Sequence, residues 1–250
     1  MKKIFLIAFA AGMLTTAQAG DTLTVRIDGM HCDNCSRKVR QLLKPEAGVN
    51  SIATNIERHT ATIVYDKALT SSASLRAKLD ATERYKTSAY NASDIIMNGI
   101  GLRIDDMHCQ KCADRITQRL QKVAGVDSLT FKLDKHYVYV RYDANRTSRA
   151  DIRAALVQSG YTPCTYYKSD KGAYAYYLLP AEQATEDTQE TVLAIDGVGD
   201  VTVSPRRKAM AVAYFSDEVT AEQLLAAIQK AGIKAALPKP HECSEEEGKK

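Results

Sequence analysis

The chain has 250 residues with 34 Lys and Arg against 30 Asp and Glu, a formal net charge of +4, and 45% hydrophobic and 26% charged residues. This composition is typical of a globular protein and argues against long disorder, collagen-like structure and a polytopic membrane protein. The basic excess is too small to indicate nucleic-acid binding, and six cysteines are too few for a disulfide scaffold.

The first nineteen residues have the layout of a secretory signal peptide. Lysines at positions 2 and 3 precede an apolar run at residues 4–14, and Ala17-Gln18-Ala19 is a small-residue cleavage sequence. The run is shorter than the ~20 residues that span a bilayer. We therefore expect residues 1–19 to be removed, and the mature protein to be periplasmic or secreted, with no stable membrane insertion.

Residues 27–66 repeat at 104–143. A shift of 77 aligns the two segments without gaps and gives fifteen identities in forty positions. A fainter third copy follows at a shift of 72, in which Gly125-Val126 maps to Gly197-Val198 and Tyr142 maps to Tyr214. Such repetition predicts three small tandem domains.

Each copy predicts the same order of elements. An alternating apolar stretch such as residues 23–27 predicts a strand, and a cysteine loop and an amphipathic helix follow it. Two short alternating runs then predict a hairpin, with a turn at Asp134-Lys135 in the second copy. A second helix begins near Ser72, Ser148 or Thr220, and a last strand closes the copy. This βαββαβ order predicts an α+β fold of three tandem ferredoxin-like sandwiches, the third degenerate.

The predicted domains are separated by short polar linkers. The boundaries are a signal peptide at 1–19, domains at 20–92, 97–168 and 171–238, and a disordered tail at 239–250. In the third domain the cysteine positions of the repeat hold Ala181 and Ala184. The third copy therefore keeps the repeat without its thiols.

Two Cys-x-x-Cys pairs, Cys32 with Cys35 and Cys109 with Cys112, lie where the first strand of a copy meets its first helix. A helix N-terminus presents unpaired N–H groups and partial positive charge, which favour the thiolate form. The spacing lets both sulfurs converge on one point. Two thiolates form a soft site for Cu(I), Hg(II), Cd(II) or Zn(II), although zinc prefers four ligands.

The two loops read Gly29-Met30-His31-Cys32-Asp33-Asn34-Cys35 and Asp106-Met107-His108-Cys109-Gln110-Lys111-Cys112. They resemble the Gly-Met-x-Cys-x-x-Cys loop of heavy-metal-associated (HMA) domains, which occur in copper chaperones, in metal-pumping P-type ATPases and in periplasmic mercury-binding proteins. The resemblance covers two copies fully and the third by its repeat alone. It implies metal binding and handover by ligand exchange between similar domains.

The resemblance also implies roles for single residues. By position, the metal ligands would be Cys32, Cys35, Cys109 and Cys112. Met30 and Met107 would pack beneath the loops, and Tyr161 and Tyr85 would match the family's aromatic turn beside the metal loop. Departures from the family are Asp106 in place of Gly, Arg84 before Tyr85, and Ala181 and Ala184 in the third copy.

Other residues keep more than one interpretation. His59 and His136 recur in both thiol-bearing copies and become Lys208 in the third; they are either turn residues or auxiliary ligands. Cys164 and Cys243 could form a disulfide, or Cys243 could join His241 in a loose metal clasp. We interpret His31 and His108 as tuning the charge and exposure of their loops. Tyr174, Tyr176 and Tyr177 are interpreted as strand packing.

Three classes of function compete. The leading one is a non-enzymatic, exported binder of soft ions, with Cu(I) the first choice and Hg(II), Zn(II) and Cd(II) the alternatives. It would sequester metal or pass it to a protein partner, either a transporter or another HMA-like domain. The second is a periplasmic thiol–disulfide redox protein, since thioredoxin-type enzymes also carry Cys-x-x-Cys at a helix start. The third is a metal-independent interaction scaffold, although the export signal and weak basic balance argue against nucleic acid as its partner.

Overall fold

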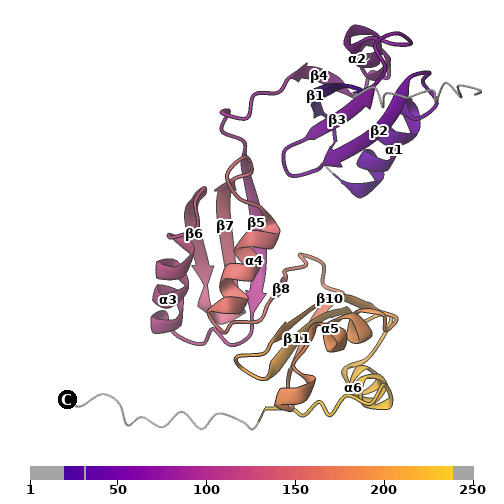
Figure 1. Cartoon of the computed structure of the whole chain (residues 1–250). Coiled ribbons are helices and arrows are strands. Elements are labelled where there is room, and N and C mark those ends of the chain that lie inside the picture. Colours follow the sequence, from indigo (N-terminus) through magenta and orange to yellow (C-terminus); the bar gives the residue numbers. More distant parts are fainter. Residues whose placement is uncertain (1–19, 31, 239–250) are drawn as a thin grey trace, which may run out of the picture. The chain divides into compact units, whose positions relative to one another are not determined.

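The computed structural model describes residues 20–30 and 32–238, so the predicted signal peptide and C-terminal tail lie outside it. Contacts divide the chain into two compact units, Met1–Asn91 and Ala92–Lys250 (Figure 1). The first unit contains one antiparallel sheet and the second contains two.

The first unit is a complete βαββαβ sandwich. Its elements are β1 (Asp21–Asp28), α1 (Asp33–Leu43), β2 (Val49–Asn55), β3 (Thr60–Tyr65), α2 (Ser72–Asp80) and β4 (Lys86–Ala89). The sheet order is β2-β3-β1-β4, and side chains of both helices join those of the sheet in one core. This order is that of the predicted ferredoxin-like fold.

The first half of the second unit repeats this sandwich. Its elements are β5 (Met97–Ile104), α3 (Gln110–Leu120), β6 (Val126–Lys132), the 3₁₀ turn η1 (Leu133–Lys135), β7 (Tyr137–Asp143), α4 (Arg149–Gln158) and β8 (Pro163–Thr165). The sheet order, β6-β7-β5-β8, matches that of the first unit. The mixed α/β fold class with antiparallel sheets is thus confirmed for both thiol-bearing copies.

The second half of the second unit is an incomplete copy, called here the third domain. Its elements are β9 (Gly172–Leu178), the 3₁₀ turn η2 (Ala181–Gln183), α5 (Glu186–Leu193), β10 (Val198–Ser204), β11 (Ala209–Phe215) and α6 (Ala221–Lys230). The sheet has three strands in the order β10-β11-β9. In place of the expected last strand, Ala236 makes a single antiparallel bridge to Leu178.

The second helix of each copy begins at a hydroxyl N-cap and buries one apolar face. Ser71, Ser148 and Thr220 accept hydrogen bonds from backbone N–H groups three residues later. The first of these caps lies one residue before the predicted start. The buried apolar residues of these helices include Leu75, Leu79, Ile152, Leu156, Leu224 and Ile228. Local periodicity and capping therefore account for where these helices form.

Within the second unit, the third domain packs against β8 and α4 of the preceding sandwich. Arg153 of α4 and Asp200 of β10 form a two-pronged ion pair, with N–O distances of 2.6 and 3.0 Å. Thr165 of β8 donates its backbone N–H to the same carboxylate at 2.7 Å. Asp200 directly follows a bulge in β10, which re-aims the strand at this point.

The described helices have at most eleven residues. In that part of the chain, none combines the length and the apolar character that crossing a bilayer requires.

Candidate metal centre

The four motif cysteines lie at the N-termini of the two matching helices. Cys32 is the N-cap of α1 and Cys109 is the N-cap of α3, and both side chains are exposed. Cys35 and Cys112 lie in the first helical turn and are buried. Each centre therefore pairs one accessible sulfur with one that is shielded from water, at the positive end of a helix dipole.

The two sulfurs of each pair lie close together. The Sγ atoms are 2.6 Å apart in the first unit and 3.5 Å apart in the second. Two thiolates on one ion at metal–sulfur distances of about 2.3 Å lie about 3.8 Å apart at a tetrahedral angle and about 4.6 Å apart in a linear arrangement. Both pairs are closer than this, so binding an ion between the two sulfurs requires them to move apart.

Each loop rests on a buried methionine and a buried tyrosine. Met30 and Met107 have no exposed surface, as expected for side chains beneath the loops. Tyr85 donates its hydroxyl to the Cys35 carbonyl at 3.3 Å, and Tyr161 donates to the Cys112 carbonyl at 3.4 Å. The two tyrosines are therefore structural counterparts that hold the backbone of the second cysteine.

The recurring histidines brace the cysteine loops from the neighbouring hairpin. His59 and His136 have left-handed backbones, with φ of 54° and 49°. The His59 Nδ1 lies 2.8 Å from the Met30 carbonyl and the His136 Nδ1 lies 2.9 Å from the Met107 carbonyl. A carbonyl only accepts, so each Nδ1 carries the proton. This geometry favours the turn-residue interpretation over ligation through Nδ1.

Replacing His136 with alanine is expected to lower the free energy of unfolding of its sandwich, because the ring's hydrogen bond is lost. The loss should exceed by about 1 kcal/mol the loss caused by an alanine at a left-handed turn residue that makes no such bond. Lys208→Ala supplies the matched control, since Lys208 has the same left-handed backbone, with φ of 53°. Urea denaturation followed by pulsed hydrogen exchange checks the difference. Equal losses in the two variants would contradict the bracing role.

An arginine that the sequence analysis did not assign contacts the buried sulfur in each unit. Arg84 donates to the Cys35 Sγ at 3.4 Å, and Arg115 donates to the Cys112 Sγ at 3.5 Å. Arg115 lies three residues after Cys112, which places both on one helix face, so this contact had a sequence signal. Arg84 is distant from Cys35 in the sequence, so its contact has no comparable sequence signal.

Polar contacts favour ionisation at the second centre. Burial by itself raises the pKa of the Cys112 thiol. Hydrogen bonds from the His108 backbone, the Cys109 thiol and the Arg115 guanidinium outweigh burial and lower that pKa below its usual 9.0. The sulfur is thus prepared to act as an anionic ligand.

In residues 20–30 and 32–238, no group of three or more Cys, His, Asp or Glu side chains is placed to hold a metal ion. His108 packs its ring edge-on against His136, with ring centroids 5.4 Å apart. His31 lies outside the described residues. Each centre thus presents two sulfurs, a donor set that suits ions of low coordination number better than four-coordinate zinc.

The third domain lacks a comparable centre in its backbone as well as in its side chains. Ala181 lies in the 3₁₀ turn η2, and Ala184 is buried just after it. The N-cap of α5 is Thr185, so this helix starts four residues later than the repeat predicts. The alanines that replace the cysteines therefore do not stand at a helix N-terminus.

One cysteine outside the two motifs, Cys164, lies between the two sheets of the second unit. Cys164 is buried there and donates to the Ala211 carbonyl at 3.3 Å, and burial raises the pKa of its thiol far above the usual range. Cys243 and His241 lie outside the described residues, so the proposed disulfide and clasp stay predictions.

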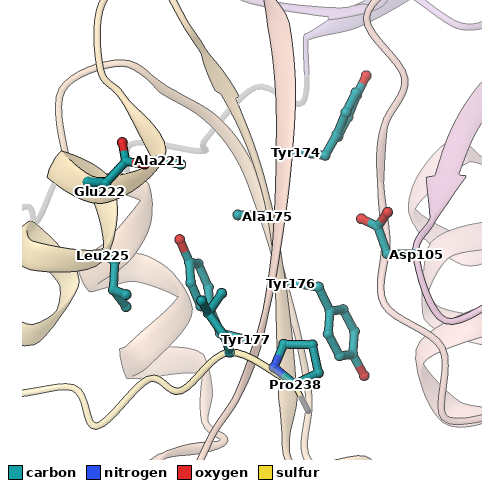
Figure 2. A pocket seen from close by; sticks show the side chains of 10 residues that line it. Asp105, Tyr174, Ala175, Tyr176, Tyr177, Ala221, Glu222, Leu225 and Pro238 are labelled. Atoms are coloured by element: carbon teal, nitrogen blue, oxygen red, sulfur yellow. The ribbon is translucent and has the colours of Figure 1, made fainter. Parts of the chain in front are cut away.

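A cavity of about 520 Å³ lies along β9, and its lining includes Asp105 and residues of α6. Figure 2 shows Tyr174 and Tyr176 on the side of β9 nearer Asp105, and Tyr177 on the side of α6 with Leu225. Tyr177 belongs to the core of the third domain, while Tyr174 and Tyr176 pack against the cluster around Cys164. The three tyrosines thus serve strand packing, as interpreted from the sequence.

Comparison with known proteins identifies the two thiol-bearing copies. Residues 24–85 and 102–162 each match the heavy-metal-associated domain family. Among curated proteins, a copper-exporting P-type ATPase of Bacillus subtilis is 26% identical over 139 residues, covering 56% of this chain and 16% of the relative. Copper-transporting ATPase 1 of Rattus norvegicus is 25% identical over 284 residues, covering 90% of this chain and 19% of the relative.

Among solved structures, the N-terminal soluble domains of Bacillus subtilis CopA are 25% identical, with 60% of this chain and 96% of that chain covered and a TM-score of 0.27. The matches to the two ATPases named above cover less than a fifth of the length of either ATPase. The two family matches coincide with the two sandwiches that carry the Cys-x-x-Cys loops, so the chain contains two heavy-metal-associated domains.

Proposed function

We propose that this protein binds Cu(I) at two Cys-x-x-Cys centres and holds it for sequestration or for transfer to a partner. The observation that carries the proposal is the arrangement repeated in both units: two converging sulfurs at a helix N-terminus, with an arginine on the buried sulfur. Soft thiolate ligands select Cu(I), and two thiolates with one Cu(I) leave a net charge of −1, which the arginine offsets.

The two ATPase relatives support copper as the cargo, since both are named as copper-transporting ATPases. The exposed sulfurs of Cys32 and Cys109 offer an incoming ligand a point of attack. Transfer then proceeds as the partner's thiolate displaces first the exposed cysteine and then the buried one. The partner would be a transporter or another domain of the same family.

The compartment is part of the proposal. The basic, apolar and small-residue order of residues 1–19 supports export to the periplasm or beyond the cell. Cell fractionation with mass analysis of the purified protein checks this: a mature chain should begin at Gly20 and be found outside the cytoplasm. A cytoplasmic chain that still starts at Met1 would remove this part of the proposal.

The binding test is an anaerobic titration of the reduced protein with Cu(I) against a chromophoric Cu(I) chelator. The wild-type chain should retain two equivalents, and a variant with serine at Cys32, Cys35, Cys109 and Cys112 should retain none. Cys164→Ser is the matched control, because it removes a buried thiol outside both centres and should leave two equivalents. Retention by the four-serine variant would refute the proposal.

The same variants separate this function from thiol–disulfide exchange. A redox protein would reduce or isomerise a model disulfide substrate in a reaction that needs the motif cysteines and is indifferent to copper. A metal carrier should show no such turnover, and loading with one Cu(I) per centre should protect its cysteines from alkylation.

A further inference from the structure

The two metal centres differ in which residue places a guanidinium over the loop tyrosine. In the first unit, the guanidinium of Arg84 lies over the ring of its neighbour Tyr85, 5.8 Å from the centroid. The position before Tyr161 in the second unit is Gly160, which has no side chain to offer. The guanidinium over Tyr161 instead belongs to Arg207 of the third domain, 5.6 Å from the ring centroid.

The two roles that Arg84 combines in the first unit are thus divided in the second. Arg84 contacts both the buried sulfur and the loop tyrosine. In the second unit Arg115 contacts the sulfur and Arg207 covers the tyrosine. Since Tyr161 donates its hydroxyl to the Cys112 carbonyl, Arg207 is connected to the cysteine loop through one side chain.

Arg207 lies in the β10–β11 turn, and a buried carboxylate faces it. Its Nε is 3.6 Å from Asp106, whose side chain is only 3% exposed. Neither carboxylate oxygen of Asp106 has a hydrogen-bond partner among the described residues. The corresponding residue of the first unit is Gly29, where an added Cβ would lie 2.4 Å from the Arg84 carbonyl oxygen. Asp106 therefore stands only in the unit whose tyrosine is covered by the third domain.

The turn is held at this place by contacts on both sides. Arg206 donates to the Gln158 carbonyl at the end of α4, at 3.2 Å. Farther along β10, Asp200 is fixed by Arg153. The third domain thus meets the second sandwich at several separate points, and Arg207 is placed by that docking rather than by chance proximity of one flexible side chain.

We propose that the third domain completes the second metal centre, with Arg207 acting as a positioning residue that holds Tyr161, and through it the Cys112 loop, in the metal-binding arrangement. The inference rests on the proposed Cu(I) function. It assigns the thiol-free domain a role in metal affinity and makes the two centres unequal, because the first depends on its own Arg84 and the second depends on a neighbouring domain.

The test measures each centre alone. The full chain with Cys32→Ser and Cys35→Ser reports the second centre, and the full chain with Cys109→Ser and Cys112→Ser reports the first. In chelator competition, Arg207→Ala should weaken Cu(I) binding at the second centre about fivefold, as expected for losing a cation–ring contact. It should leave the first centre unchanged. Lys230→Ala, which removes the same charge from the exposed end of α6 in the same domain, is the matched control and should have little effect.

A double-mutant cycle distinguishes positioning from general stabilisation. If Arg207 acts through Tyr161, the effect of Arg207→Ala should be largely lost in a Tyr161→Leu background. The ring resonances of Tyr161 in metal-free protein should also shift in Arg207→Ala and stay in place in Lys230→Ala, which gives a readout without copper. An Arg207→Ala effect that is absent, equal at both centres or undiminished in Tyr161→Leu would overturn the inference. Loss of Cu(I) binding by the parent chain would instead refute the proposed function.

Discussion

Replacing Arg153 with alanine is expected to lower the free energy of unfolding of the second unit by about 3 kcal/mol, because it leaves the Asp200 carboxylate without its counter-ion. The pair is largely shielded from water, with side chains 23% and 17% exposed. Arg153 also donates to the Thr202 hydroxyl at 2.6 Å, so its removal leaves a second polar group without its donor. The loss should fall on the contact between the second sandwich and the third domain.

The measurement must resolve the domains, since a chain of several domains does not unfold in one step. Peptide-resolved hydrogen exchange during urea denaturation meets this need, and the Thr165 amide, which donates to Asp200, reports the contact directly. Lys171→Ala is the control, because it breaks the exposed Lys171–Asp217 pair and should change nothing measurable. An equally small effect of Arg153→Ala would show that the ion pair does not hold the domains together.

Replacing Asp106 with asparagine should stabilise the second unit at neutral pH by up to about 3 kcal/mol, and the gain should disappear below about pH 4. Burial raises the pKa of Asp106 from 3.8 to about 6, against the opposing effects of Arg207 and of the nearby Thr162 backbone. The folded protein therefore binds this proton more tightly than the unfolded chain does. Stability contributed by the group is complete below pH 3.8 and is lost as the pH rises through 6.

Unfolding free energies of wild type and Asp106→Asn between pH 4 and pH 8 check this expectation. Their difference cancels the other titrating groups and should grow with pH, levelling off above about 7. The raised pKa already includes the opposing attraction of Arg207, so the expected gain is net of that contact. Parallel curves over the whole range would contradict a raised pKa at Asp106.

Much of the fold could be predicted because its signals are local. Strand alternation, helix periodicity and the hydroxyl caps at Ser148 and Thr220 depend on neighbours in sequence, and the internal repeat supported the same assignment twice. The place of the motif cysteines at the helix N-termini follows from the same signals. Their role as metal ligands is still a prediction.

The contacts around the centres were harder to predict because they join distant parts of the chain. Arg84 reaches Cys35 from a loop in which Glu83 has a left-handed backbone, with φ of 57°. Arg207 reaches Tyr161 only because two domains dock in one register. Such docking depends on the fit of two surfaces, which neither periodicity nor spacing records.

The late start of α5 limits what engineering could add to the third domain. Its first helix begins after Thr185, and the two positions that align with the motif cysteines fall in and just after a short 3₁₀ turn. Cysteines placed at Ala181 and Ala184 would therefore lack the helix dipole and backbone N–H groups that favour the thiolate form. A thiol centre in this domain would require an earlier helix start as well as two new side chains.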